Sequence, residues 1–196
     1  MAAGAVLALV LLAAIAGLTW RSRGANDLPP RHFALPEFAL VERSGRPATL
    51  SALRGRPWIA DFIFTRCAGV CPAMTARMAA LSKRLDGAPV RFVSFTVDPV
   101  FDTPEVLTGY ASAAGASPEW WFVTGPVADL HQLATGGFKL AAMEAEPGQA
   151  FDDGPFLHSS KFVLVDATGT IRGYYDSTDE QALRALEADA RKLAAP

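Results

Sequence analysis

The two cysteines of the chain, Cys67 and Cys71, are the residues whose type and spacing most directly suggest chemistry. Three residues separate them, and Pro72 follows the second one directly. Two thiolates held close together can form a disulfide, exchange disulfides with another molecule, or chelate a soft metal ion. The elements on either side of this stretch must therefore bring both sulfurs to one point.

Pro72 predicts where the helix that follows the cysteines begins. Proline is disfavoured inside a helix but favoured at its first position, so we expect a helix over residues 72–85. Cys71 is then the cap or the last loop residue, and the loop must fold back toward the helix N-terminus. The partial positive charge of that end favours thiolate. The buried face of the helix would carry four apolar residues at the helical period: Met74, Met78, Leu81 and Leu85.

A purely structural disulfide is the simplest alternative for the cysteine pair. Closing a ring of about five residues stabilises a fold by only about 2 kcal/mol, a weak contribution for a domain of this size. The spacing also differs from the CxxC pattern of thioredoxin redox motifs, because one more residue lies between the cysteines. On the residues alone, a redox pair and a metal-binding pair remain equally supported.

A third ligand would favour metal binding, and His158 is the candidate. It precedes a predicted strand, and active sites on such sheets gather at strand ends; an ordinary loop histidine is the alternative. His32 is expected to be solvated, and His131, in the middle of a predicted helix, is expected to be a surface or packed histidine rather than a ligand. Met74 and Met78 have the spacing of a core stripe rather than of a ligand pair.

Composition argues against nucleic-acid binding. The chain has 196 residues, a formal net charge of -2 and a pI of about 5.9. No block of lysine and arginine is present. Nucleic-acid-binding domains are usually basic, with their positive charge gathered on one face, so no nucleic-acid partner is expected.

The N-terminal segment has the composition of a membrane anchor. Residues 1–20 carry no charged side chain, and about 20 apolar residues span a bilayer core. We expect a transmembrane anchor here, with a cleaved signal peptide as the alternative. Residues 21–35 are rich in proline and polar residues and predict a linker, and residues 36–196 form the domain. Arg21 and Arg23 favour a cytoplasmic position for the residues after the anchor, which leaves the orientation open.

The alternation of strand and helix patterns predicts an α/β fold. We expect a thioredoxin-like domain with an N-terminal hairpin extension, a mixed central sheet flanked by helices, and an N-terminal transmembrane helix. The predicted elements are a hairpin over 38–50, a buried strand over 58–64 that contains Asp61, the helix 72–85, a strand over 90–97, a helix over 104–114 capped by Thr103, a strand over 120–123, a helix over 127–135 stopped by Gly136 and Gly137, a strand over 138–143, an acidic insert over 144–155, a strand–turn–strand over 161–175 and a final helix over 179–193.

Four motifs, in order along the chain, resemble those of the Sco/SenC family. The resemblance covers residues 33–193, nearly the whole domain, and the cysteine motif alone would be less specific. The motifs are the cysteine segment 64–72, the Thr96–Pro99 segment with Asp102, Thr103 and Pro104 after it, the segment 121–125, and the segment 157–160.

The resemblance implies a membrane-tethered thioredoxin-fold protein that binds copper, as Cu(I) or Cu(II), through Cys67, Cys71 and His158. It also implies a role in assembling the binuclear copper centre of cytochrome c oxidase, on the periplasmic or intermembrane-space side. The implied partners are the copper-site subunit of the oxidase and a thioredoxin-like reductant. Gly69 and Leu157 stand where the family often has aspartate. These two departures put in doubt the contacts with a partner or the adjustment of the ligands by neighbouring groups, but they do not affect the three ligands themselves.

Two alternatives use the same cysteines. A membrane-anchored thiol–disulfide oxidoreductase would keep the cysteines of the oxidase copper site reduced, and His158 would then be incidental. A peroxiredoxin-like peroxidase would use Cys67 as its peroxidatic residue, but the sequence carries no peroxidase signature beyond the shared fold. The copper-carrier function is the prediction, and an enzymatic function is the less favoured one.

Overall fold

The computed structural model describes residues 27–67, 69–140 and 159–195. Within them, the strands are β1 (Ala39–Glu42), β2 (Pro47–Thr49), β3 (Trp58–Ile63), β4 (Arg91–Thr96), β5 (Trp120–Thr124), β6 (Lys161–Val165) and β7 (Ile171–Asp176). The helices are α2 (Leu50–Leu53), α3 (Val70–Arg84), α4 (Pro104–Ala113), α5 (Val127–Gln132), which a π-helical turn over Leu133–Gly137 continues, and α6 (Glu180–Ala194).

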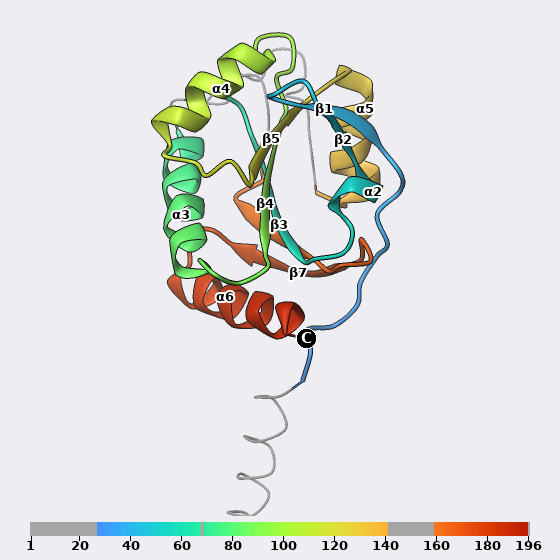
Figure 1. Ribbon diagram of the computed structural model, residues 1–196, viewed down its shortest axis with the longest axis vertical. Helices are drawn as coiled ribbons and strands as arrows, with labels where there is room; N and C mark the ends of the chain where they lie inside the picture. Colours follow the sequence, from blue (N-terminus) through green and yellow to red (C-terminus); the bar gives the residue numbers. More distant parts are fainter. Residues whose placement is uncertain (1–26, 68, 141–158, 196) are drawn as a thin grey trace, which may run out of the picture.

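All the described strands join one mixed sheet, in the order β2-β1-β5-β4-β3-β6-β7. The three central strands, β3, β4 and β5, are parallel, while the outer strands on both sides are antiparallel to their neighbours (Figure 1). The central strands are almost entirely buried, as expected for parallel strands covered on both faces. The carboxyl ends of these strands therefore meet at one edge of the sheet, where the cysteine loop leaves β3.

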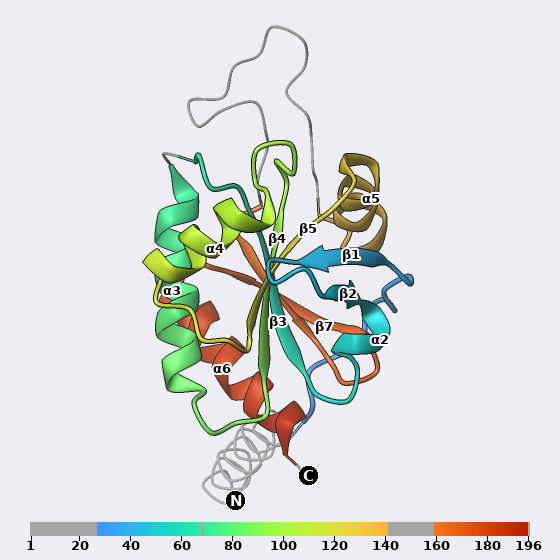
Figure 2. The same cartoon turned by 45° about the horizontal axis from the view of Figure 1, so that its top comes forward.

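Helices cover both faces of the sheet (Figure 2). The core on one face joins α3, α4 and α6 to the sheet, and the core on the other face joins α2, α5 and the π-helical turn to it. β3 contributes to both cores by alternation: Ile59 and Ile63 face α3, while Trp58, Ala60 and Phe62 face the other side. Together with the mixed sheet, this arrangement confirms the predicted α/β fold.

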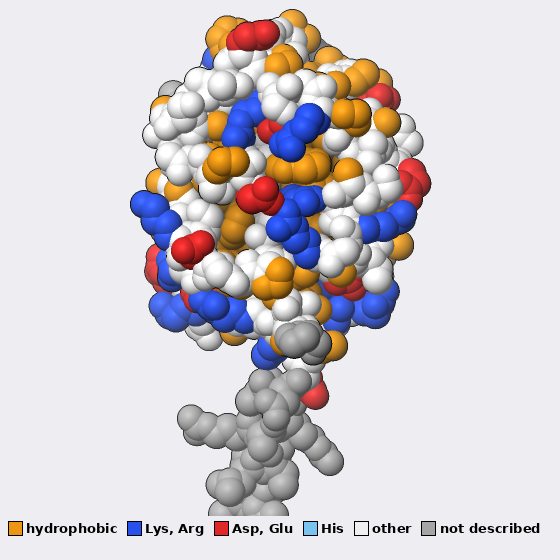
Figure 3. Space-filling view, in the orientation of Figure 1, with side chains coloured by type: hydrophobic (Ala, Val, Ile, Leu, Met, Phe, Trp, Pro, Cys, Tyr) orange, Lys and Arg blue, Asp and Glu red, His pale blue; other side chains and the backbone are white. Residues whose placement is uncertain are grey.

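One face of the protein carries basic and acidic side chains interspersed with apolar ones (Figure 3). Several arginines of the domain lie over aromatic rings. Arg43 lies 5.1 Å from the Phe122 ring centre, and Arg91 lies 4.5 Å from that of Trp121. These cation–π contacts cover aromatic surface of β5 at the sheet.

The first turn of α6 depends on the side chain of Asp179. Its carboxylate accepts a hydrogen bond from the backbone N–H of Gln181 at 2.7 Å, as an N-cap does. Replacing Asp179 with alanine is expected to lower the free energy of unfolding by about 1 kcal/mol, measured by urea denaturation. Arg184→Ala, at an exposed position within the same helix, is the control and should change it by less than about 0.5 kcal/mol. An equal loss in both variants would contradict the capping role.

Two predicted boundaries are wrong. The helix after the cysteines begins at Val70 rather than at Pro72, so Cys71 lies inside its first turn. The first four N–H groups of a helix lack intrahelical partners, so proline is tolerated throughout the first turn and does not fix the first position. The helix predicted over 127–135 changes at Leu133 into the π-helical turn, which includes both glycines expected to stop it.

The strand predicted over 138–143 is absent from its described part, residues 138–140. Phe138 and Leu140 are buried and Lys139 is exposed, which imitates the alternation of a strand. Lys139 instead has φ 54°, in the left-handed region, and this breaks the extended conformation. The Phe138 ring packs edge-on against Phe62, 5.2 Å between centres, so the segment fills the core without joining the sheet.

The described part of the predicted linker, residues 27–35, runs beside β7. Backbone hydrogen bonds join His32 N to Ile171 O and Ile171 N to Phe33 O, at 2.9 and 2.8 Å. The guanidinium of Arg172 donates to the carbonyl oxygens of Pro29 and Pro30. The predicted anchor, residues 1–20, lies outside the described residues. None of the helices in the described ranges is long and apolar enough to cross a membrane.

Candidate metal centre

The two cysteines lie at the carboxyl edge of the central strands. β3 ends at Ile63, and Cys67 follows in the loop that leads to α3. Cys71 is in the first turn of α3, and its backbone N–H donates to the sulfur of Cys67 at 3.5 Å. The sulfur of Cys67 therefore occupies the helix N-terminus, where N–H groups and the helix dipole stabilise an anionic ligand such as a thiolate.

Both cysteines are thiols in this structure, and both are buried. Cys67 is 6% exposed and Cys71 is 0% exposed. Burial raises the pKa of the Cys71 thiol well above its ordinary value, and the neighbouring Cys67 and Asp61 raise it further. A metal ion bound by this thiol would have to displace its proton.

Asp61 lies in β3, on the face of the sheet that α3 covers. It is 0% exposed, and neither of its carboxylate oxygens has a hydrogen-bond partner among the described residues. Burial raises its pKa to about 7. Ser94, which lies opposite Asp61 on β4, lowers the pKa of Asp61 slightly but is not in hydrogen-bonding geometry with it. The Ser94 hydroxyl instead accepts a hydrogen bond from Trp120 Nε1 at 2.9 Å. The sequence placed Asp61 in a buried strand, and the structure confirms it.

A polar pair from α3 and α4 lies in the same region. The hydroxyls of Thr75 and Tyr110 are 2.7 Å apart. Burial raises the pKa of Tyr110 to about 12, and the charges of Cys71 and Asp61 contribute to the rise. Nothing in the sequence around either residue indicates this pair, because Thr75 and Tyr110 belong to two helices and only the packing of those helices brings them together.

The loop after β4 lies beside the cysteine loop. Arg66 Nε donates to Asp98 Oδ2 at 3.1 Å, and the Arg66 guanidinium lies 4.3 Å from the ring centre of Phe101. Asp98 is buried, whereas the side chain of Arg66 is half-exposed. The two motifs that resemble the Sco/SenC signatures around Cys67 and Asp98 are therefore in contact.

His158, the predicted third ligand, lies outside the described residues, as does the acidic insert over 144–155. Within the described ranges, no group of three or more His, Cys, Asp or Glu side chains could hold a metal ion. Met74 and Met78 are fully buried in the core beneath α3, which confirms their expected packing role. His131 and His32 are exposed, His131 on α5 and His32 on the segment beside β7.

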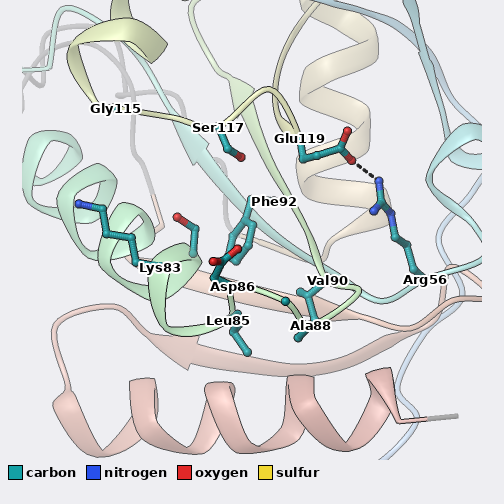
Figure 4. Close-up of a pocket in the computed structure, with 12 residues that line it drawn as sticks. Arg56, Lys83, Leu85, Asp86, Ala88, Val90, Phe92, Gly115, Ser117 and Glu119 are labelled. Carbon is teal, nitrogen blue, oxygen red and sulfur yellow. Dashed lines mark hydrogen bonds and ion pairs between the residues drawn. The ribbon is translucent and has the colours of Figure 1, made fainter.

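A cavity of about 390 Å³ lies near the C-terminal end of α3 and the start of β4 (Figure 4). Its lining includes Lys83, Asp86, Phe92 and the ion-paired Arg56 and Glu119. This is the end of the sheet opposite the cysteine loop, because β4 begins there and the cysteines follow the end of β3. The cavity contains none of the predicted site residues.

A parallel strand followed by a cysteine loop and a helix, in a mixed sheet with helices on both faces, defines a thioredoxin-like protein. A protein-family model described as SCO1/SenC matches residues 27–194, and the chain belongs to this family. The chain is 32% identical over 152 residues to a protein of Stutzerimonas stutzeri that is named for copper binding, covering 75% of this chain and 71% of that one.

Two solved structures are similar in both sequence and fold. The crystal structure of a SCO1/SenC family lipoprotein from Bacillus anthracis has a TM-score of 0.77 and 30% identity, covering 86% of this chain and 100% of that one. The structure of BsSco has a TM-score of 0.72 and 30% identity, covering 85% and 95%. It is described as containing a disulfide switch and as a member of the Sco family of cytochrome c oxidase assembly proteins.

Proposed function

We propose that this protein binds copper and delivers it to the binuclear copper centre of cytochrome c oxidase. The observation that carries the proposal is the cysteine pair at the N-terminus of α3 in a chain of the SCO1/SenC family. Thiolates are the ligands that Cu(I) prefers, and both thiols here come from one loop and one helical turn. The relative from Stutzerimonas stutzeri supports copper as the metal.

His158 is the proposed third ligand. Cys67 and Cys71 would bind Cu(I), and the imidazole of His158 would complete a mixed sulfur and nitrogen set for Cu(II). The pair must be reduced before it binds metal, because a disulfide offers no thiolate. Copper would then pass to the copper-site subunit of the oxidase by ligand exchange.

The proposed location follows from the proposed partner. Residues 1–20 would anchor the protein in the membrane, with the domain on the periplasmic or intermembrane-space side. The BsSco relative, which belongs to a family of oxidase assembly proteins, supports an oxidase as the acceptor. Reporter fusions to the N- and C-termini would test the orientation, and a cytoplasmic domain would contradict it.

A second candidate function is thiol–disulfide exchange that keeps the cysteines of the oxidase copper site reduced. The specific observation in its favour is that the backbone N–H of Cys71 reaches the sulfur of Cys67, so the two thiols are neighbours. The disulfide switch described for BsSco also supports it. A thioredoxin-like protein would be the reductant that regenerates the dithiol.

The test of the three-ligand site uses the reduced full-length chain and its His158→Ala variant. Copper affinity is measured by competition with a chromophoric chelator, and the Cu(II) absorption spectrum is recorded. Loss of the imidazole should weaken Cu(II) binding by at least about 10-fold and shift the thiolate-to-copper absorption. His131→Ala, which removes an exposed histidine on α5, is the matched control and should leave both unchanged. Unchanged affinity and spectrum for His158→Ala would contradict the third ligand, and a wild-type chain that binds no copper would contradict the carrier function.

A further inference from the structure

Asp102 is a buried carboxylate that the proposed copper chemistry does not use. It lies in the loop between β4 and α4 and is 0% exposed. Its oxygens accept three donors: the backbone N–H of Thr65 at 3.1 Å, the hydroxyl of Thr65 at 2.5 Å and the hydroxyl of Thr96 at 2.5 Å. A hydrogen bond is stronger in the low-dielectric interior than in water, and a buried donor that loses its acceptor there is left unsatisfied.

These donors come from two different parts of the fold. Thr65 belongs to the cysteine loop, two residues before Cys67, and Thr96 is the last residue of β4. Asp102 is itself fixed, because its backbone N–H donates to Asp98 O at 2.9 Å. Its neighbour Thr103 caps α4. The carboxylate therefore ties the start of the cysteine loop to a rigid strand end and to the first turn of a helix.

The neighbouring contact of Arg66 with Asp98 is a weaker tie. The Arg66 side chain is 53% exposed, so water screens its ion pair with Asp98. Asp102 has no such exposure, and its loss would leave the Thr65 N–H and two hydroxyls without their acceptor. Asp102 is therefore the main link between the two loops.

We propose that Asp102 is a positioning residue for Cys67. It fixes the backbone at Thr65 and so holds the Cys67 sulfur where the N–H of Cys71 meets it. Replacing a residue that orients a metal ligand without touching the metal typically weakens metal binding by about 10- to 100-fold. The inference rests on the proposed copper site for its effect on affinity, but the placement of the Cys67 sulfur can be tested without any metal.

The experiment compares Asp102→Asn with Asp166→Asn in the full-length chain. Asp166 is the control: like Asp102 it is a buried loop carboxylate that accepts from a backbone N–H and a threonine hydroxyl, those of Thr168, and it differs in also pairing with Arg172 at 3.1 Å. It follows β6 at the opposite end of the sheet. Asp102→Asn should lower Cu(I) affinity at least 10-fold and raise the rate of Cys67 alkylation by iodoacetamide at least threefold, while Asp166→Asn should leave both within twofold of wild type.

A second pair of variants keeps the test decisive if Asp102→Asn fails to fold. Thr65→Val removes one donor to Asp102 and retains the shape of the side chain, whereas Thr65→Ser retains the hydroxyl. Thr65→Val should raise the alkylation rate of Cys67, as Asp102→Asn does, and Thr65→Ser should have the wild-type rate. Wild-type alkylation rates in every folded variant, Thr65→Val included, would overturn the positioning role.

Copper binding by the wild type tests the carrier function, and the alkylation rate of Cys67 in the variants tests the positioning role of Asp102. If the wild-type chain binds no copper, the carrier function is lost, but faster alkylation in Asp102→Asn and Thr65→Val would still support the positioning role. If copper binds to wild type and to both variants with equal affinity and the alkylation rates are also equal, the copper function stands and the role of Asp102 is overturned.

Discussion

Replacing Asp61 with asparagine is expected to make the protein more stable at pH 8 than the wild type, by up to about 4 kcal/mol. Burial raises the pKa of this carboxyl to about 7 in the folded protein, whereas an aspartate in the unfolded chain titrates near about 3.9. One pKa unit corresponds to about 1.4 kcal/mol, which sets the upper limit of the effect. Asparagine has nearly the same shape and does not ionise.

The sign of the pH dependence follows from which state holds the proton. Between about pH 4 and pH 7 the folded protein keeps the proton on Asp61 and the unfolded chain has lost it, so stability falls as the pH rises. The contribution of the protonated carboxyl is fully present below about pH 4 and is lost once the pH has passed about 7. Asp61→Asn should therefore resemble wild type at pH 4 and exceed it increasingly up to pH 8.

Urea denaturation at intervals from pH 4 to pH 8 measures this difference. Subtracting the two unfolding free energies cancels the titration of the other carboxyls, which both proteins share. Asp86→Asn, which changes an exposed aspartate after α3, should alter stability by less than about 0.5 kcal/mol throughout. A constant difference between wild type and Asp61→Asn across the pH range would show that Asp61 ionises in the folded protein as readily as in the unfolded chain.

The sequence predicted the strands and helices that position the cysteines because their signals are local. The apolar run of β3 predicts a strand that is buried on both faces. Asp61 is the one acidic residue in this run, so the sequence also predicts a buried carboxyl there. Thr103 predicts the start of α4, and its hydroxyl accepts from the N–H of Val106 as expected for a cap. In each case the deciding residues lie within a few positions of the feature that they determine.

The parts that the sequence did not predict depend on contacts between distant segments. Thr65 and Asp102 are 37 residues apart, and nothing in either segment alone indicates that one accepts hydrogen bonds from the other. The start of α3 differs from the prediction for a local reason, because proline is compatible with any position of the first helical turn. The sequence predicts a strand that begins at Phe138, whereas the aromatic core around Phe62 determines the position of this residue.

The two cysteines are expected to respond to serine substitution in ways that distinguish copper carriage from thiol exchange. A hydroxyl is a poor ligand for Cu(I), so Cys67→Ser and Cys71→Ser should each lower Cu(I) affinity by about 100-fold or more. The two losses should be similar, because carriage requires both thiolates. Competition with a chromophoric chelator measures them.

Thiol exchange, in contrast, gives the two sulfurs different roles. Cys67 is 6% exposed and Cys71 is fully buried, so Cys67 is the sulfur that can attack the disulfide of a partner. That attack forms a mixed disulfide and releases one partner sulfur as a thiolate. Cys71 then attacks the Cys67 sulfur, which releases the second partner thiolate, so that the partner is reduced and this protein is left with a disulfide between its cysteines.

Cys71→Ser should therefore accumulate the mixed disulfide if the protein is a reductant, and Cys67→Ser should not. The measurement incubates each reduced variant with a peptide that contains an intramolecular disulfide and detects the adduct by non-reducing electrophoresis and mass spectrometry. An equal loss of Cu(I) affinity in the two variants, without any adduct in either, would support carriage alone. An adduct confined to Cys71→Ser, with copper affinity unchanged in both variants, would support reduction alone. Both results together would mean that one dithiol serves both reactions, because each uses the same pair of sulfurs in its reduced form.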